Sequence, residues 1–178
     1  MTPALVRIMA AYGAWMNGRM LDLCGDLTDV ERRRDPGTFF RSVHGTFDHL
    51  IHGDVAWMGR FTGSAMPTKR IGEIVHESWG ELDAARRAMD RRMEAWAGTV
   101  TEPWLAETMT YVSANDGKTR ILPRWVLAAH MFNRSTHHRG PLTTLMKQLG
   151  VDPGITDLPW LPAPYDGSVL SATVAAEM

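Results

Sequence analysis

The chain has 178 residues, of which 44% are hydrophobic and 22% are charged, a composition that excludes a disordered chain and a membrane protein. This length suits one domain that buries a core without disulfides or structural metals. The 19 basic and 20 acidic side chains leave a formal net charge of −1. Nucleic-acid binding needs an excess of basic residues, so we expect no nucleic-acid partner. From the length we expect a single domain over residues 1–178.

Local features of the sequence support a cytoplasmic location. Arg86, Arg87, Arg91 and Arg92 form the one basic group, and their helical spacing indicates a solvated helix face. Cys24 is the only cysteine, and it is expected to be a small buried residue. The N-terminus lacks the pattern of a signal peptide, and no apolar run reaches the roughly 18 to 20 residues that span a bilayer.

The first part of the chain predicts one long helix and one short helical turn. Apolar residues recur at steps of three and four over residues 3–24, which predicts a helix with one buried face. Thr28 and Glu31 have the spacing of a capping box and predict a helical turn. The residues of the apolar face are Leu5, Ile8, Met9, Tyr12, Trp15, Met16, Met20 and Leu23.

Two further helices are predicted after the turn at residues 35–37. The second helix is expected over residues 39–61 and the third over residues 71–97, with a loop at residues 63–67 between them. The apolar stripe assigned to the third helix starts with Ile71, Ile74 and Val75, and its opposite face is charged, as in a helix that covers a core.

The last third of the chain predicts a hairpin, a fourth helix and an irregular tail. Alternating residues between 104 and 123, with Asn115-Asp116-Gly117 between them, are typical of a β-hairpin. A helix follows over residues 124–149, and Pro141 is expected to kink or unwind it. From about residue 151 the chain is rich in Pro and Gly, so we expect a tail that packs through Trp160, Leu161 and Tyr165 and frays over residues 173–178.

These segments predict an all-α protein, namely an up-down four-helix bundle with a small β-hairpin before the fourth helix. Bundle interiors are a common place for metal and ligand sites whose side chains come from facing helices.

Histidines concentrate in two of the predicted helices. The second helix holds His44, His49 and His52, and the fourth holds His130, His137 and His138. Neutral imidazole is a common ligand of zinc, nickel and iron, and a catalytic site needs about three ligands and one open position. We expect Asp48 and Asp54 to fix the ligand imidazoles through their second ring nitrogens. His44 and the remaining His76 are interpreted as structural.

Two runs of residues resemble a known family. Residues 39–50, continued by Asp54, Trp57, Arg60 and Phe61, resemble the second helix of the DinB/YfiT-like family. Residues 130–140 resemble the signature of its fourth helix, and the similarity covers nearly the whole chain in order and length.

The resemblance implies a four-helix bundle, often a homodimer, that holds a divalent metal with three histidines. The ligand of the second helix corresponds to His49 and one ligand of the fourth helix to His138. The remaining ligand position is Arg134, and a guanidinium has no lone pair for a cation. The third ligand is therefore predicted to be His52, with His130 as the alternative. The other outcomes are a weak site of two histidines and water, or loss of the metal. Pro141 also departs from the usual Gln of the signature.

The resemblance also implies a metal-dependent enzyme, either a transferase or isomerase that uses a low-molecular-weight thiol or a hydrolase. Zinc or nickel on His49 and His138 would lower the pKa of a bound thiol or water. Arg134 or Arg139 would orient the carboxylate of a small-molecule substrate.

The alternative is a non-enzymatic small-ligand-binding or stress-response protein in which Arg134 binds an anion in place of the metal. Its pocket would be lined by Trp15, Met16, His49, Met131 and Arg134. A third possibility is that the histidine cluster is a relic and that the chain acts through a dimer surface.

Overall fold

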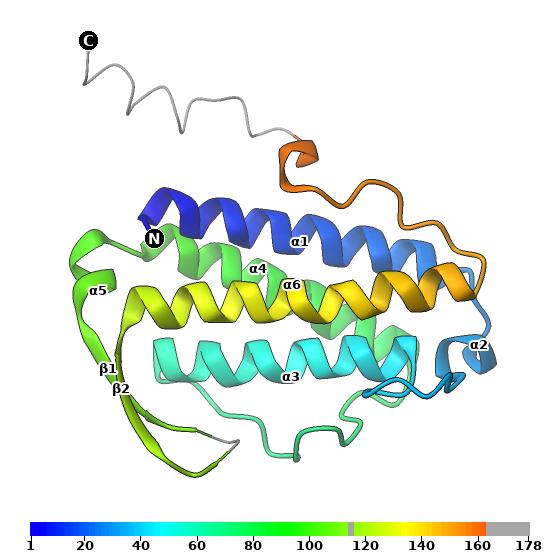
Figure 1. The fold of residues 1–178 in the computed structure, drawn as a ribbon, viewed down its shortest axis with the longest axis horizontal. Helices are drawn as coiled ribbons and strands as arrows, with labels where there is room; N and C mark the ends of the chain where they lie inside the picture. Colours follow the sequence, from blue (N-terminus) through cyan, green and yellow to red (C-terminus); the bar gives the residue numbers. More distant parts are fainter. Residues whose placement is uncertain (114–115, 163–178) are drawn as a thin grey trace.

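Four long helices dominate the computed structural model, which describes residues 1–113 and 116–162. They are α1 (Pro3–Gly25), α3 (Val43–Thr62), α4 (Trp79–Thr99) and α6 (Arg124–Gln148). The helices lie side by side in Figure 1. The all-α class is thereby confirmed. None of the described helices is long and apolar enough to cross a membrane.

Shorter elements connect the long helices. They are α2 (Asp29–Arg33), α5 (Glu102–Ala106), β1 (Thr108–Val112), β2 (Thr119–Pro123) and the 3-10 helix η1 (Leu158–Trp160). The strands pair antiparallel, with Thr108 opposite Pro123, which confirms the hairpin. The capping box of Thr28 and Glu31 is present at α2. Helix α5 was not predicted, although Thr101 caps it and Pro103 lies in its first turn, both ordinary start signals.

The long helices do not alternate in direction, so the predicted up-down order is wrong. Contacts between α3 and α4 advance together along both helices, from Asp54 with Arg86 to Phe61 with Trp96. These two helices therefore run parallel, and residues 63–78 run back along α3 to connect them (Figure 1). Helices α3 and α6 run antiparallel, because His49 contacts His138 while Trp57 contacts His130.

Helix α3 begins at Val43 and not at residue 39. Ser42 caps it by accepting a hydrogen bond from the amide of Gly45. Arg41 just before it has a φ of +65°, which no helix accommodates. The preceding Phe39 and Phe40 lie in a turn instead, and their position outside the helix shapes the site described below.

Helix α4 begins at Trp79, so residues 71–78 belong to the crossing connection and the predicted start at residue 71 is wrong. Ser78 and Glu81 form a capping box there, a start signal that the apolar residues upstream obscured. Ile71 and Val75 are exposed rather than part of a buried stripe.

Asp48 and two histidines anchor the crossing connection to α3. The buried Asp48 carboxylate accepts hydrogen bonds from the amides of Val75 and His76, and its Oδ1 lies 2.6 Å from His76 Nδ1. His44 is fully buried, and its Nε2 lies 2.7 Å from the carbonyl oxygen of His76. The structural roles predicted for His44 and His76 are therefore confirmed.

The end of the chain partly follows expectation. Helix α6 continues without interruption through Pro141, so the predicted local unwinding is wrong. Leu158 and Leu161 pack on the core, whereas Trp160 is exposed. The predictions for Tyr165 and for residues 173–178 fall outside the described residues.

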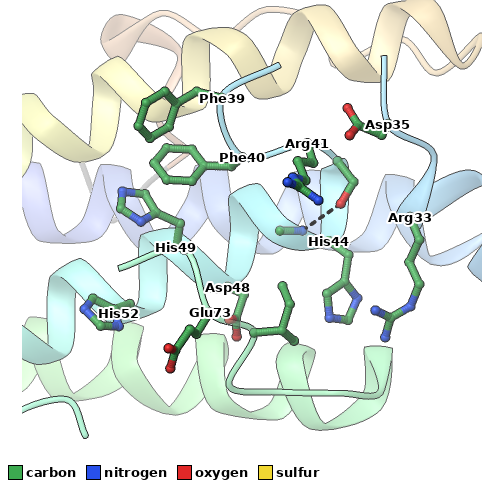
Figure 2. A pocket seen from close by; sticks show the side chains of 14 residues that line it. Arg33, Asp35, Phe39, Phe40, Arg41, His44, Asp48, His49, His52 and Glu73 are labelled. Carbon is green, nitrogen blue, oxygen red and sulfur yellow. Dashed lines mark hydrogen bonds between the residues drawn. The ribbon is translucent and has the colours of Figure 1, made fainter. Parts of the chain in front are cut away.

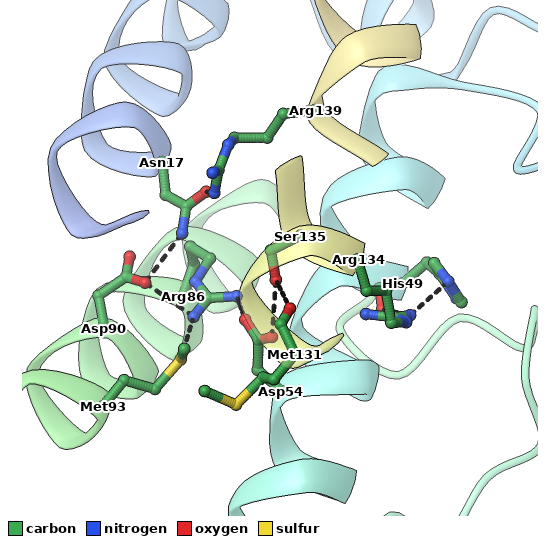
Figure 3. A network of polar contacts seen from close by, with 10 residues as sticks. All are labelled: Asn17, His49, Asp54, Arg86, Asp90, Met93, Met131, Arg134, Ser135 and Arg139. Carbon is green, nitrogen blue, oxygen red and sulfur yellow. Dashed lines mark hydrogen bonds and ion pairs between the residues drawn. The ribbon is translucent and has the colours of Figure 1, made fainter. Parts of the chain in front are cut away.

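The core consists of two apolar clusters, one toward the hairpin and one toward α2. Cys24 belongs to the second cluster and is fully buried, as predicted; burial raises the pKa of its thiol to about 12. A network of buried charged and polar side chains from all four long helices lies among these apolar residues (Figure 3).

Candidate functional site between helices α3 and α6

The site is centred on His49 of α3, with Arg134 and His138 of α6 against it. Arg134 donates a hydrogen bond from Nη2 to His49 Nε2 over 2.6 Å, and a longer one of 3.4 Å to the His49 carbonyl oxygen. The ring centroids of His49 and His138 are 4.7 Å apart. The structure thus brings His49, Arg134 and His138 together, as predicted, and Figure 3 shows the contact between His49 and Arg134.

Gly53 gives the Arg134 side chain the space to reach His49. A Cβ atom added at Gly53 would overlap the guanidinium of Arg134. Gly53 lies one turn after His49 on α3, so the two residues share a helix face. A glycine and an arginine on facing helices thus determine the contact together, and no local sequence pattern pairs them.

The contact with Arg134 fixes the protonation of His49. Every guanidinium nitrogen is a donor, so His49 Nε2 accepts and the ring carries its proton on Nδ1. Burial, with a smaller contribution from the charge of Arg134, lowers the pKa of His49 to about 3. The same two causes lower the pKa of His138 to about 4. Both imidazoles are therefore neutral at pH 7, while Arg134 remains a cation.

Two buried donors at this site have no acceptor among the described residues. They are Nη1 of Arg134 and the protonated Nδ1 of His49. A buried donor without an acceptor costs roughly 1–3 kcal/mol. Such atoms are uncommon in folded proteins, and each calls for an acceptor or another explanation.

Phe40 covers the imidazoles from outside. Its ring is stacked on His49 with centroids 3.6 Å apart and an interplanar angle of 18°, and it meets His138 edge-on at 5.3 Å. Figure 2 shows Phe39 and Phe40 lying over His49. The sequence predicted these residues as helix, so their role as a cover was missed.

The other predicted site residues lie around this centre or away from it. The ring of His52 is parallel to that of His49, with centroids 6.5 Å apart. His130 is exposed and packs on Trp57, while His137 is exposed beside His138. Arg139 projects to the opposite side of α6, where it contacts Asn17 and the ring of Tyr12.

The pocket predicted for the ligand-binding alternative is corrected in part. Met16 and Met131 are fully buried core residues. Trp15 packs beside Tyr12 on α1. Neither these three residues nor Arg134 line the two cavities that reach His49 and His138.

Asp48 and Asp54 do not accept hydrogen bonds from the imidazoles of His49 and His138, contrary to prediction. Asp48 anchors the crossing connection, as described above. Asp54 lies 2.6 Å from Arg86 and accepts a hydrogen bond from Ser135. Arg86 is fully buried and also pairs with Asp90 at 2.8 Å, so the predicted solvated basic face is wrong at this residue. Burial opposes the charge of Arg86, but the two carboxylates raise its pKa.

The residues at the site do not fit a three-ligand metal centre as they stand. Arg134 occupies the lone pair of His49 Nε2 and supplies none of its own. Within residues 1–113 and 116–162, no three His, Cys, Asp or Glu side chains are placed to hold one metal ion. The ligand set of His49, His138 and His52 therefore stays a prediction.

The fold and the site define a helical protein with two neutral imidazoles and one arginine between antiparallel helices. The chain belongs to the DinB family, whose model matches residues 2–167. Proteins of this family typically bind metal ions. No curated protein matches the chain.

Proposed function

We propose that this protein binds a small anionic molecule, with a carboxylate as the simplest case, at Arg134 and His49. The observation that carries the proposal is the pair of buried donors, Arg134 Nη1 and His49 Nδ1, without acceptors in the described chain. A carboxylate supplies several acceptor positions and a charge opposite to that of Arg134. A carboxylate that reaches these atoms supplies an acceptor that they lack.

The charge balance around Arg134 supports an anionic ligand. The nearby Asp54 is engaged by Arg86 and Ser135, and no carboxylate of residues 1–113 and 116–162 forms an ion pair with Arg134. Burial lowers the pKa of Arg134, although Asp54 partly offsets this effect. Because His49 and His138 are neutral, the charge in contact with His49 is the guanidinium of Arg134, and a ligand with one negative charge neutralises it.

The test is calorimetric titration of the purified protein with acetate, with and without a metal chelator. We expect binding that survives the chelator and that is lost in Arg134→Gln. Arg120→Gln is the matched control, because Arg120 is a paired surface arginine on the hairpin, and this variant should bind as the parent does. Acetate binding that is unchanged in Arg134→Gln would exclude the proposal.

Metal-dependent catalysis of the type suggested by the family is the second candidate. It is favoured by the close approach of His49 to His138 and by their lowered pKa values, since neutral imidazoles are competent ligands. It requires Arg134 to leave His49 Nε2. Elemental analysis of the protein as purified tests it: zinc or nickel at one equivalent per chain, lost in a His49→Ala and His138→Ala double variant, would favour this candidate over anion binding.

A further inference from the structure

Phe40 occupies a position at the site that a flat ring fits well. Its face is stacked on the ring of His49. It meets the ring of His138 in an edge-to-face arrangement, with an interplanar angle of 74°. Offset stacking and edge-to-face contacts are the two favoured arrangements of aromatic rings. The two imidazoles thus form a corner that binds one aromatic ring, and in this structure the ring belongs to the protein.

The backbone next to Phe40 is under local constraint. Arg41 is the one non-glycine residue with positive φ among residues 1–113 and 116–162, a conformation that persists only when the surroundings enforce it. The carbonyl of Phe40 accepts a hydrogen bond from the amide of Ser42 and approaches Gly45 so closely that a Cβ there would overlap it. A change of the Arg41 backbone to negative φ would relieve this strain and would move the neighbouring Phe40 ring.

Phe40 also separates two cavities. One cavity, of about 540 Å³, reaches His49 and His52 from the side of Asp48. The other, of about 510 Å³, reaches His138 from the side of Pro141. Phe39 and Phe40 line both of them, so displacement of the Phe40 ring would open space beside His49 and His138 for another ring.

We propose that Phe40 is a gate, and that the ligand for which it makes way is a small aromatic carboxylate. The aromatic ring of the ligand takes the place of the Phe40 ring on His49 and His138, and its carboxylate is bound by Arg134. This inference rests on the anion-binding function proposed above and adds the part of the ligand that lies outside the carboxylate.

Benzoate is the probe, and cyclohexanecarboxylate and acetate are its controls. Removal of the competing ring in Phe40→Ala should tighten benzoate binding roughly two- to tenfold, the equivalent of one aromatic pair. Acetate affinity should not change, because acetate has no ring to place. Cyclohexanecarboxylate should gain less than benzoate, because it lacks a π face. An equal gain for both cyclic acids, or no gain for benzoate, would overturn the gate.

A second variant protects the test against a failure of folding. Phe40→Leu keeps an apolar side chain of similar reach while removing the stacked ring, and thermal unfolding reports whether either variant is folded. In Phe40→Leu we again expect benzoate to gain over cyclohexanecarboxylate, and an unchanged ratio of the two affinities would contradict the inference.

The two proposals fail in distinguishable ways. If acetate binds through Arg134 but Phe40→Ala leaves the ratio of benzoate to acetate affinity unchanged, the gate is wrong and the anion site stands. If Phe40→Ala tightens benzoate binding and the added Arg134→Gln change has no effect, Phe40 gates an aromatic site and the carboxylate contact is wrong.

Discussion

Substitution of Gly53 by alanine probes the contact between α3 and α6 that builds the site. The new methyl group would overlap the guanidinium of Arg134, so the arginine must turn away and release His49 Nε2. Loss of a hydrogen bond to a charged group costs about 1.5–3 kcal/mol. Replacement of glycine by alanine inside a helix returns about 0.5–1 kcal/mol. We therefore expect a net loss of about 0.5–2.5 kcal/mol in the free energy of unfolding.

Urea denaturation measures this loss, and Gly13→Ala is the matched control. Gly13 lies inside α1, where a new Cβ would meet only Arg139 Nη1 at 3.9 Å, so that variant should be more stable by about 0.5–1 kcal/mol. NMR titration of His49 in Gly53→Ala should show a pKa above that of the parent, because the charge of Arg134 has moved away, yet still below 6.5, because burial remains. Stabilisation of Gly53→Ala equal to that of Gly13→Ala would refute the assigned contact.

Three further predictions follow from the described contacts. The pKa values of His49 and His138 lie at about 3 and 4 in the folded protein, so the unfolded chain binds protons first as pH falls below 6.5. The free energy of unfolding should be full above that pH and decline down to about pH 3, by at most about 1.4 kcal/mol per pH unit and histidine before solvent screening. A His49→Gln and His138→Gln variant should show a flatter profile of urea midpoint against pH. Asp54→Asn should lower the free energy of unfolding by about 3–5 kcal/mol, since it leaves the buried Arg86 without one partner. The control Asp22→Asn, at an exposed ion pair, should lower it by about 0–1 kcal/mol. Equal losses in the two variants would contradict the role of burial. Asp48→Asn should speed limited proteolysis within residues 63–78 by about tenfold or more, because the anchoring hydrogen bonds weaken, and an unchanged cleavage rate would disprove the anchor.

Periodicity and turn chemistry predicted most of the fold, because both act locally. The apolar steps of α1 and α6 and the alternation in the hairpin predicted those elements within a few residues. The same reasoning failed at residues 71–78, where Ile71 and Val75 happened to extend the stripe of α4. It also could not give the direction of α4, which depends on how far the preceding connection travels.

The site was predictable where the motif spacing carried the information. His49, His138 and Arg134 come together as the spacing and the resemblance implied. Arg139 was wrongly assigned to the site, although helix geometry already separates it from Arg134, because five residues on a helix turn a side chain to the far face. The roles of Gly53 and Phe40 depend on contacts between helices and loops, and no pattern in the local sequence predicts these contacts.

Calorimetric titration with nickel, comparing the parent with Arg134→His, tests most directly whether Arg134 has replaced a metal ligand. The parent should bind nickel no more tightly than a His49→Ala and His138→Ala variant does. Arg134→His should gain a site of one ion per chain, because three imidazoles would then meet between α3 and α6. A tight, stoichiometric nickel site in the parent that needs His49 and His138, with nothing gained in Arg134→His, would contradict the assignment of Arg134 as the cation of this site.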